Sequence, residues 1–144
     1  MFKKAALAVL VIACLSQVAQ ARDTEYKLPI QDVLNSPDFA DKVGSDVKFF
    51  FADQKAVPKQ NLGEFVTNKK TNAFNKTDEE ACRWVMLSAL IELRDRAKTE
   101  GGNAVVGISS YYKKEEFKSA TQYECHAGGL IAGVALKGTV VKMH

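Results

Sequence analysis

The sequence predicts an α+β fold in which one long helix packs on a mostly antiparallel sheet of about five strands. Two observations lead to this prediction. Residues 78–100 carry apolar side chains at helical spacing along one stripe, whereas apolar and polar side chains alternate in parts of 104–143. Two shorter strands precede the helix, so the expected order is β-β-α-β-β-β in a single domain over residues 22–144.

The long helix has clear signals at both ends. Thr77 and Glu80 form a capping box, in which each side chain can bond the free backbone N–H of the other residue. Gly101 and Gly102 end the helix, because glycine readily adopts the left-handed conformation that follows a last turn. The apolar stripe consists of Cys82, Val85, Met86, Ala89, Leu90, Leu93 and Ala97, widened by Trp84, Leu87 and Ile91.

The elements before the helix are shorter. Residues 26–29 are expected as an extended lead-in, followed by two short helical segments that end at Gly44. The alternation of side chains predicts strands over 47–51 and 64–67, with Phe49 facing the core. The polar segments 52–62 and 68–76 are expected as loops.

Three strands follow the helix, over 104–109, 121–127 and 130–143, and the last is expected to bulge at its glycines. In 121–127 the side chains alternate cleanly between two faces. The inward face holds Thr121, Tyr123, Cys125 and Ala127, and the outward face, expected to be solvated, holds Gln122, Glu124 and His126.

The N-terminus has the pattern of a secretory signal peptide over residues 1–21. Two lysines precede an apolar run over 5–15, and Ala19-Gln20-Ala21 supplies a small-x-small cleavage site. The run is shorter than the ~20 apolar residues that span a bilayer, so no membrane span is predicted. Cleavage after Ala21 is favoured because this site is well placed against the run.

A second processing route competes with that cleavage. Val11-Ile12-Ala13-Cys14 resembles the lipobox of bacterial lipoproteins, in which the cysteine is acylated and anchors the chain in the membrane. Either route predicts that the domain lies outside the cytosol, in the periplasm, with an outer-membrane lipoprotein or a secreted protein as alternatives.

The charge and the cysteine content fit a location outside the cytosol. Without Lys3 and Lys4, the 20 basic residues fall to 18 against 17 acidic ones, so no net charge draws the domain toward nucleic acid. Cys82 and Cys125 are then the two remaining cysteines, and an oxidising compartment favours a disulfide between them. Both lie on apolar faces that the fold is expected to bring together.

Catalytic and cofactor motifs are incomplete. Gly128 and Gly133 have the spacing of a phosphate loop, but Val134 and Ala135 replace the required Lys and Ser/Thr. A nucleophile paired with a histidine is also missing, so we predict no enzyme activity, no catalytic residue and no cofactor. We expect no metal site either, because Cys125 points to the opposite side of its strand from His126.

One predicted loop is a candidate partner-binding surface. Lys69, Lys70 and Lys76 surround Phe74 in the polar segment 68–76. Solvation of the lysines alone would explain such a loop. An exposed aromatic side chain among them also suits binding to a protein partner.

Several motifs resemble the YbjQ/RcsF-like domain family. Residues 102–107, Gly-Asn-Ala-Val-Val-Gly, are similar to the segment in which a YbjQ-type helix ends and a strand begins, and 133–141 resemble the last strand of that family. The resemblance implies the same α+β fold, and through the RcsF-like members a periplasmic, non-enzymatic interaction or envelope-sensing module with a protein partner. Through the YbjQ-type members it implies the alternative of a small ligand- or metal-binding domain.

The chain departs from the RcsF-like pattern, which has four cysteines in two bridges against the pair present here outside the leader. A shared fold is therefore better supported than a shared signalling role. Residues 63–76 also resemble uncharacterised exported proteins of Gram-negative bacteria that are sometimes labelled excinuclease ATPase subunits. That label does not fit a short chain with an export signal and an incomplete phosphate loop.

Overall fold

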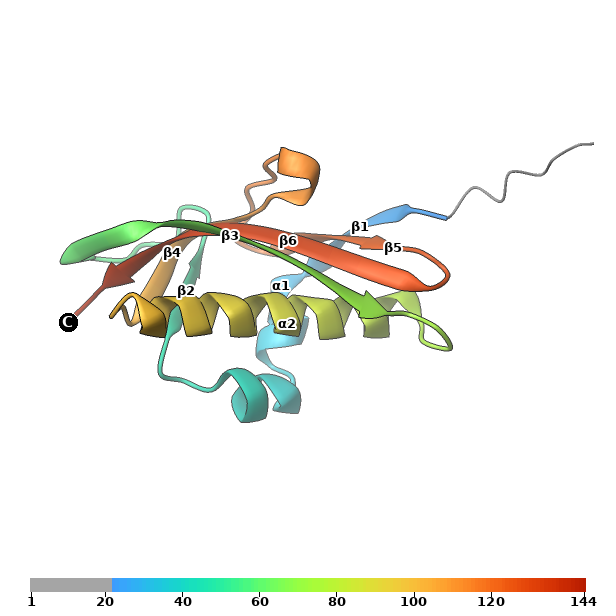
Figure 1. The fold of residues 1–144 in the computed structure, drawn as a ribbon, viewed down its shortest axis with the longest axis horizontal. Coiled ribbons are helices and arrows are strands. Elements are labelled where there is room, and N and C mark those ends of the chain that lie inside the picture. Colours follow the sequence, from blue (N-terminus) through green and yellow to red (C-terminus); the bar gives the residue numbers. More distant parts are fainter. Residues whose placement is uncertain (1–21) are drawn as a thin grey trace, which may run out of the picture.

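The computed structural model describes residues 22–144, and both the predicted signal peptide and the predicted alternative acylation site at Cys14 lie outside this range (Figure 1). Within the described range, no helix has the length and apolar character needed to cross a membrane. The elements are β1 Thr24–Pro29, α1 Ile30–Leu34, a π-helical turn η1 Phe39–Val43, β2 Lys48–Phe51, β3 Gln60–Asn72, α2 Asp78–Thr99, β4 Ala104–Ser110, a 3-10 turn η2 Tyr112–Lys114, β5 Gln122–Ala127 and β6 Ile131–Lys142.

The predicted α+β architecture is confirmed at this level: one long helix, α2, lies against one face of a curled and mostly antiparallel sheet (Figure 1). The strand order is β1-β5-β6-β4-β2, and β3 pairs with the other side of β6. Within residues 22–144, only β2 and β4 run parallel. Strand β6 is therefore the centre of the sheet, with β3 along one side and β5 and then β4 along the other.

The sheet formed by the described residues has six strands rather than about five. The segment expected as a lead-in is strand β1, which pairs with β5 from Thr24 opposite Ala127 to Pro29 opposite Gln122. Alternation in the sequence was too short there to predict a strand. Pairing along β5 supplies the backbone hydrogen bonds that hold it.

Strand β3 corrects two expected loops. It has 13 residues, and its pairing with β6 runs from Gln60 opposite Lys142 to Asn72 opposite Ile131, with an irregularity between Asn61 and Glu64. Parts of both predicted loops, 52–62 and 68–76, therefore belong to this strand. The polar composition predicted loops because local β-propensity is weak there, but strand context overrides such preferences.

Both ends of α2 lie where the sequence signals placed them, although one of the two expected capping-box bonds is formed. The side chain of Thr77 accepts a hydrogen bond from the backbone N–H of Glu80. At the other end, Gly101 has a φ of +79° and Gly102 donates its N–H to the carbonyl of Ala97 at 2.8 Å, which closes a Schellman motif.

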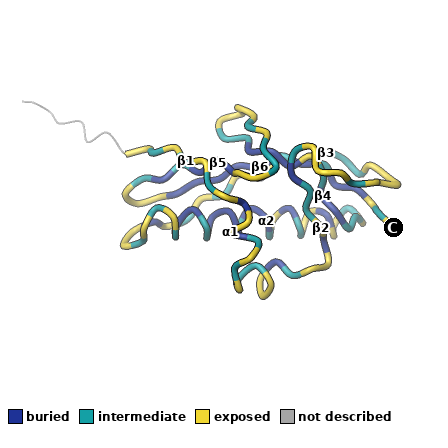
Figure 2. Tube along the Cα trace, turned by 180° about the vertical axis from the view of Figure 1, so that it is seen from behind, coloured by how far each residue is buried: buried dark blue, intermediate teal, exposed yellow. Residues whose placement is uncertain are grey.

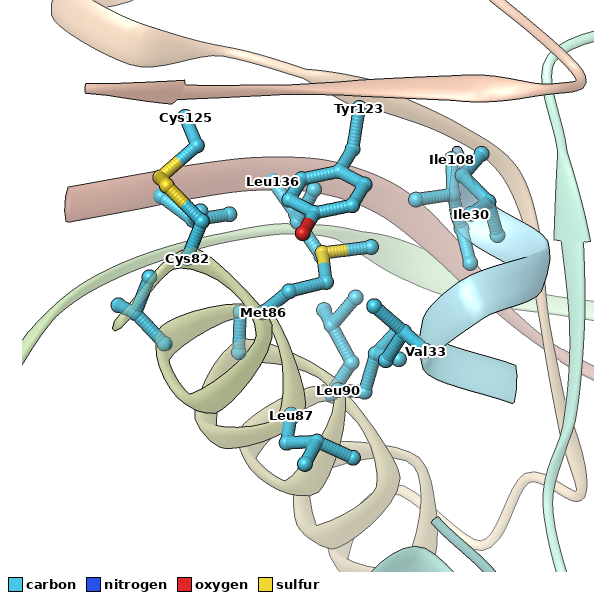
Figure 3. Close-up of a cluster of buried hydrophobic side chains, with 14 of the residues drawn as sticks. Ile30, Val33, Cys82, Met86, Leu87, Leu90, Ile108, Tyr123, Cys125 and Leu136 are labelled. Carbon is cyan, nitrogen blue, oxygen red and sulfur yellow. A yellow bond between two sulfur atoms is a disulfide. The ribbon is translucent and has the colours of Figure 1, made fainter. Parts of the chain in front are cut away.

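The core lies where α2 meets the sheet, and Figure 2 shows the buried residues gathered there while the turns are exposed. Met86 and Leu90 of α2 pack with Tyr123 of β5 in this region (Figure 3). Trp84 and Phe49, expected in the core, are only partly buried at its margin. The predicted disulfide joins Cys82 to Cys125, whose Cα atoms are 5.9 Å apart, and so fastens α2 to the inner face of β5 (Figure 3).

Candidate partner-binding surface

The four residues of the predicted partner-binding loop do not share one surface. Lys69 and Lys70 are neighbours in β3, so their side chains point to opposite faces of the sheet. Lys69 faces α2, where its ammonium forms an ion pair with Glu92 at 3.0 Å. Lys70 lies opposite Gly133 of β6 and belongs to the outer face. The structure therefore removes Lys69 from the candidate surface.

Phe74 and Lys76 lie in the turn between β3 and α2, beside the turn between β5 and β6. The backbone N–H of Ala73 donates to the carbonyl of Leu130 at 2.8 Å, which holds the two turns together. Asn72 accepts the N–H of Phe74 through its side chain, also at 2.8 Å, and this bond fixes the start of the turn.

These two turns create an exposed apolar cluster. Phe74 is 59% exposed, Leu130 65% and Ile131 56%. Together with residues 70–72 they line an open depression of about 510 Å³. We call Phe74, Leu130 and Ile131 the apolar end of the molecule.

Two lysines flank the apolar end. Lys70 lines the same depression, and the Lys76 ammonium bonds the backbone carbonyl of Asn72 at 3.1 Å. Within residues 22–144, neither lysine forms an ion pair. The apolar end is thus bordered by positive charge that no carboxylate of the described chain neutralises.

Sequence reasoning found Phe74 but missed Leu130 and Ile131. The signal was present, because Leu130 and Ile131 follow the Gly128-Gly129 turn as consecutive apolar residues, and successive strand residues cannot both face the core. What the sequence did not show was that β6 pairs with β3 up to Asn72, which places this turn beside Phe74.

A second group of polar side chains lies on the outer face of β1 and β5. His126 contacts Asp23 through Nδ1 and Glu124 through Nε2, both at 3.0 Å. The ring of Tyr112 stacks on the imidazole with the centroids 3.6 Å apart. We call Asp23, Glu25, Lys27, Glu124 and His126 the histidine–carboxylate cluster.

Glu124 and His126 face outward as predicted, but the expectation of a solvated face is wrong here. Glu124 is only 8% exposed. Strand β1 and the stacked Tyr112 cover this part of β5, and neither was expected there.

Lys27 neutralises much of the negative charge in the cluster. Its ammonium lies 2.9 Å from Glu25 and 3.3 Å from Glu124. The hydrogen bond from Lys27 lowers the pKa of Glu25, and burial raises the pKa of Tyr112, with a further rise from the nearby carboxylates of Asp23 and Glu124. These interactions tie β1 to β5 on the outer face.

The cluster also contains three potential metal ligands. Glu25, Glu124 and His126 each offer a ligand atom, and these atoms lie within 4.8 Å of one another. Asp23 holds the other ring nitrogen of His126, as outer carboxylates do for metal-bound histidines. Sequence reasoning did not predict this group, because no strand was expected over residues 23–25 and nothing placed Asp23 or Glu25 beside β5.

The glycine-rich segment over 128–133 forms the β5–β6 turn and the start of β6, so strand rather than helix follows the glycines. This context does not suit a phosphate loop, which needs a helix N-terminus after the glycines.

The chain matches no family model, no curated protein and no solved structure. The geometry of its surfaces therefore carries the functional proposal.

Proposed function

We propose that this chain is an exported, non-enzymatic interaction or envelope-sensing module of the periplasm, which binds a protein partner through its apolar end. The observation that carries the proposal is the clustering of Phe74, Leu130 and Ile131 at one end of the molecule. Exposed apolar side chains scattered singly are normal, whereas a contiguous group with a polar rim is typical of a protein interface.

The export signal and the disulfide support the proposed compartment. Residues 1–21 have the order of a signal peptide, and the Cys82–Cys125 bond is compatible with an oxidising environment. The arrangement of one long helix on a mostly antiparallel sheet also suits the YbjQ/RcsF-like resemblance. That resemblance supports a role in binding or sensing at the cell envelope.

The rim of the apolar end indicates what the partner surface offers. Lys70 and Lys76 lie beside the apolar side chains without a carboxylate partner in the described chain. A complementary surface would present apolar side chains framed by Asp or Glu. Such charge pairs mainly set the orientation and the rate of association, while burial of the apolar group supplies affinity.

Co-purification from the cell envelope tests this proposal. The full chain is exported with an affinity tag, in wild-type form and as the Phe74→Ser/Leu130→Ser double variant. Val57→Ser serves as the matched control, because Val57 is 79% exposed but not part of the apolar end. We expect one protein to co-purify with the wild type and the control but not with the double variant. Equal recovery with all three would contradict the proposal.

The alternative of a metal-binding domain has one observation in its favour, the grouping of Glu25, Glu124 and His126. Against it, Lys27 already contacts both carboxylates and supplies a positive charge there. Calorimetric titration with Zn²⁺ separates the two functions. Binding that His126→Ala abolishes would support the metal site, and an absence of binding heat would exclude it.

A further inference from the structure

We infer that the groove between β3 and α2 binds an extended peptide, which adds to the sheet as a further strand along β3. This surface is separate from the apolar end and goes beyond the function proposed above. Strand β3 is the longest in the described chain, and there it pairs with β6 alone. Figure 1 shows it along the rim of the sheet next to α2.

The register of β3 shows which backbone groups are free. Opposite residues of an antiparallel pair alternate between those that exchange hydrogen bonds and those that do not. The N–H of Ala73 donates to the carbonyl of Leu130, and the same register continues through Thr67 opposite Leu136. The odd-numbered residues from 65 to 71 therefore bond β6. Glu64, Val66, Asn68 and Lys70 direct their N–H and carbonyl groups to the open edge.

A groove runs beside this open edge. It has a volume of about 410 Å³ and lies between one segment of β3 and the second half of α2. Its floor includes Thr67 and Leu93, which are 2% and 1% exposed. The lining residues are Phe65, Val66, Thr67, Glu92, Leu93, Asp95, Arg96 and Thr99.

Thr67 points to a polar ligand in this groove. Among the residues that the structure describes, its Oγ1 is the one buried side-chain polar atom without a hydrogen-bond partner. Leaving such a group unpaired is unfavourable, because it has lost its hydrogen bonds to water without gaining others. A ligand that offers a donor or acceptor above Thr67 would recover this loss.

Two contacts between β3 and α2 flank this part of the strand. The ammonium of Lys69 pairs with Glu92 at 3.0 Å, and the guanidinium of Arg96 lies 4.2 Å from the centre of the Phe65 ring. They bridge α2 and the strand on both sides of Thr67. The groove is therefore a preformed feature of the fold.

The two faces of β3 set the side-chain pattern of the peptide. A bound strand alternates its side chains as β3 does. Side chains on the α2 side would be small and hydrogen-bonding, such as Ser, Thr or Asn, because they lie over Thr67. The outer side of β3 presents Glu64, Asn68 and Lys70 around Val66, which is 53% exposed, so the peptide side chain that lies beside Val66 would be apolar. The partner class is thus an extended segment that alternates apolar and hydroxyl-bearing residues.

Fluorescence anisotropy with a labelled, alternating valine–threonine heptapeptide tests the inference on the exported, processed protein. Asn68→Pro removes one N–H at the open edge and leaves the bonds to β6 in place, since proline is tolerated on edge strands. Its matched control is Asn68→Ala. Thr67→Val removes only the hydroxyl and keeps the shape of the side chain.

We expect the wild type and Asn68→Ala to bind the heptapeptide, Asn68→Pro to lose binding, and Thr67→Val to weaken it about fivefold, as for the loss of one hydrogen bond. Thermal unfolding of each variant shows that it is folded. The Phe74→Ser/Leu130→Ser variant should bind the peptide normally, so failure of this inference is distinct from failure of the proposed function.

Amide chemical shifts of the wild type should change at residues 64–70 and 92–99 on peptide addition. No binding by the wild type, or equal binding by Asn68→Pro, would overturn the inference. So would a wild-type dimer that Asn68→Pro dissociates, because a second copy would then occupy the edge.

Discussion

The two faces of the sheet are held by different forces. On the inner face, side chains such as Leu90 and Val134 are completely buried, and the Cys82–Cys125 bond ties α2 to β5. On the outer face, the side-chain contacts that β5 makes are the ion pair of Glu124 with Lys27 of β1, the hydrogen bond of His126 with Asp23, and the stacking of His126 on Tyr112 of η2. Burial of apolar surface stabilises far more than exposed ion pairs do. The inner face therefore contributes most of the stability of the fold.

Removal of the disulfide should give the largest loss on the inner face. The bond closes a loop with a sequence separation of 43, for which chain entropy gives about 4 kcal/mol. We expect Cys82→Ser/Cys125→Ser to lower the free energy of unfolding by about that amount in urea titrations. The wild type treated with dithiothreitol should show the same loss of unfolding free energy as the double variant. A loss under about 1 kcal/mol would show that the bridge contributes little to stability.

A cavity in the core should cost slightly less. Leu90 is fully buried, so Leu90→Ala is expected to destabilise by about 3 kcal/mol. Trp84 is only partly buried, with the Lys42 ammonium 4.1 Å from its ring centre, so Trp84→Ala should cost about 2 kcal/mol despite its larger side chain. The same urea titrations measure both. A larger loss of stability for Trp84→Ala than for Leu90→Ala would mean that Trp84 belongs to the core.

A smaller and pH-dependent effect is expected where β1 begins. The guanidinium of Arg22, followed by the hydroxyl of Tyr26, lowers the pKa of Asp78 from 3.8 to about 2. The carboxylate therefore stabilises the folded state above pH 4, and this contribution is lost as the pH falls toward 2. Because half of the Arg22 side chain is exposed and water screens the pair, the loss should be under about 1 kcal/mol.

Unfolding measured between pH 4 and pH 2 checks that expectation. Asp78→Asn should show a shallower decline in stability than the wild type, and Arg22→Gln should reproduce it. A steeper decline in either variant would contradict the assignment.

The smallest effect on stability is expected at the apolar end. Phe74→Ser/Leu130→Ser should change the free energy of unfolding by less than about 0.5 kcal/mol, because both side chains are more than half exposed. Thermal unfolding tests this directly. A large loss would mean that the apolar end contributes to the stability of the fold, so that stability would not be concentrated on the inner face.

The sequence was most informative where one face is covered by α2. The periodicity of 78–100, the Thr77 cap and the glycines after the helix predicted α2, and the alternation in β5 placed Cys125 on the same side as Cys82. These signals are local and strong, because burial imposes a regular pattern on the residues that experience it.

The rest of the fold depended on pairing between distant segments. Strand β1 is short and the second half of β3 is polar, and the backbones of the two strands are held by β5 and β6. The position of Leu130 beside Phe74 and that of Asp23 beside His126 follow from this pairing. Local composition carries no information on either contact, which is why the candidate surface was only half predicted.

Site-specific photo-crosslinking in cells that export the full chain tests most directly whether the apolar end binds a partner. A photoreactive phenylalanine replaces Phe74 in one strain and Val57 in another. We expect one discrete protein adduct from position 74 and none from position 57. No adduct from position 74, or the same adduct from both positions, would contradict the assignment of partner binding to this end of the molecule.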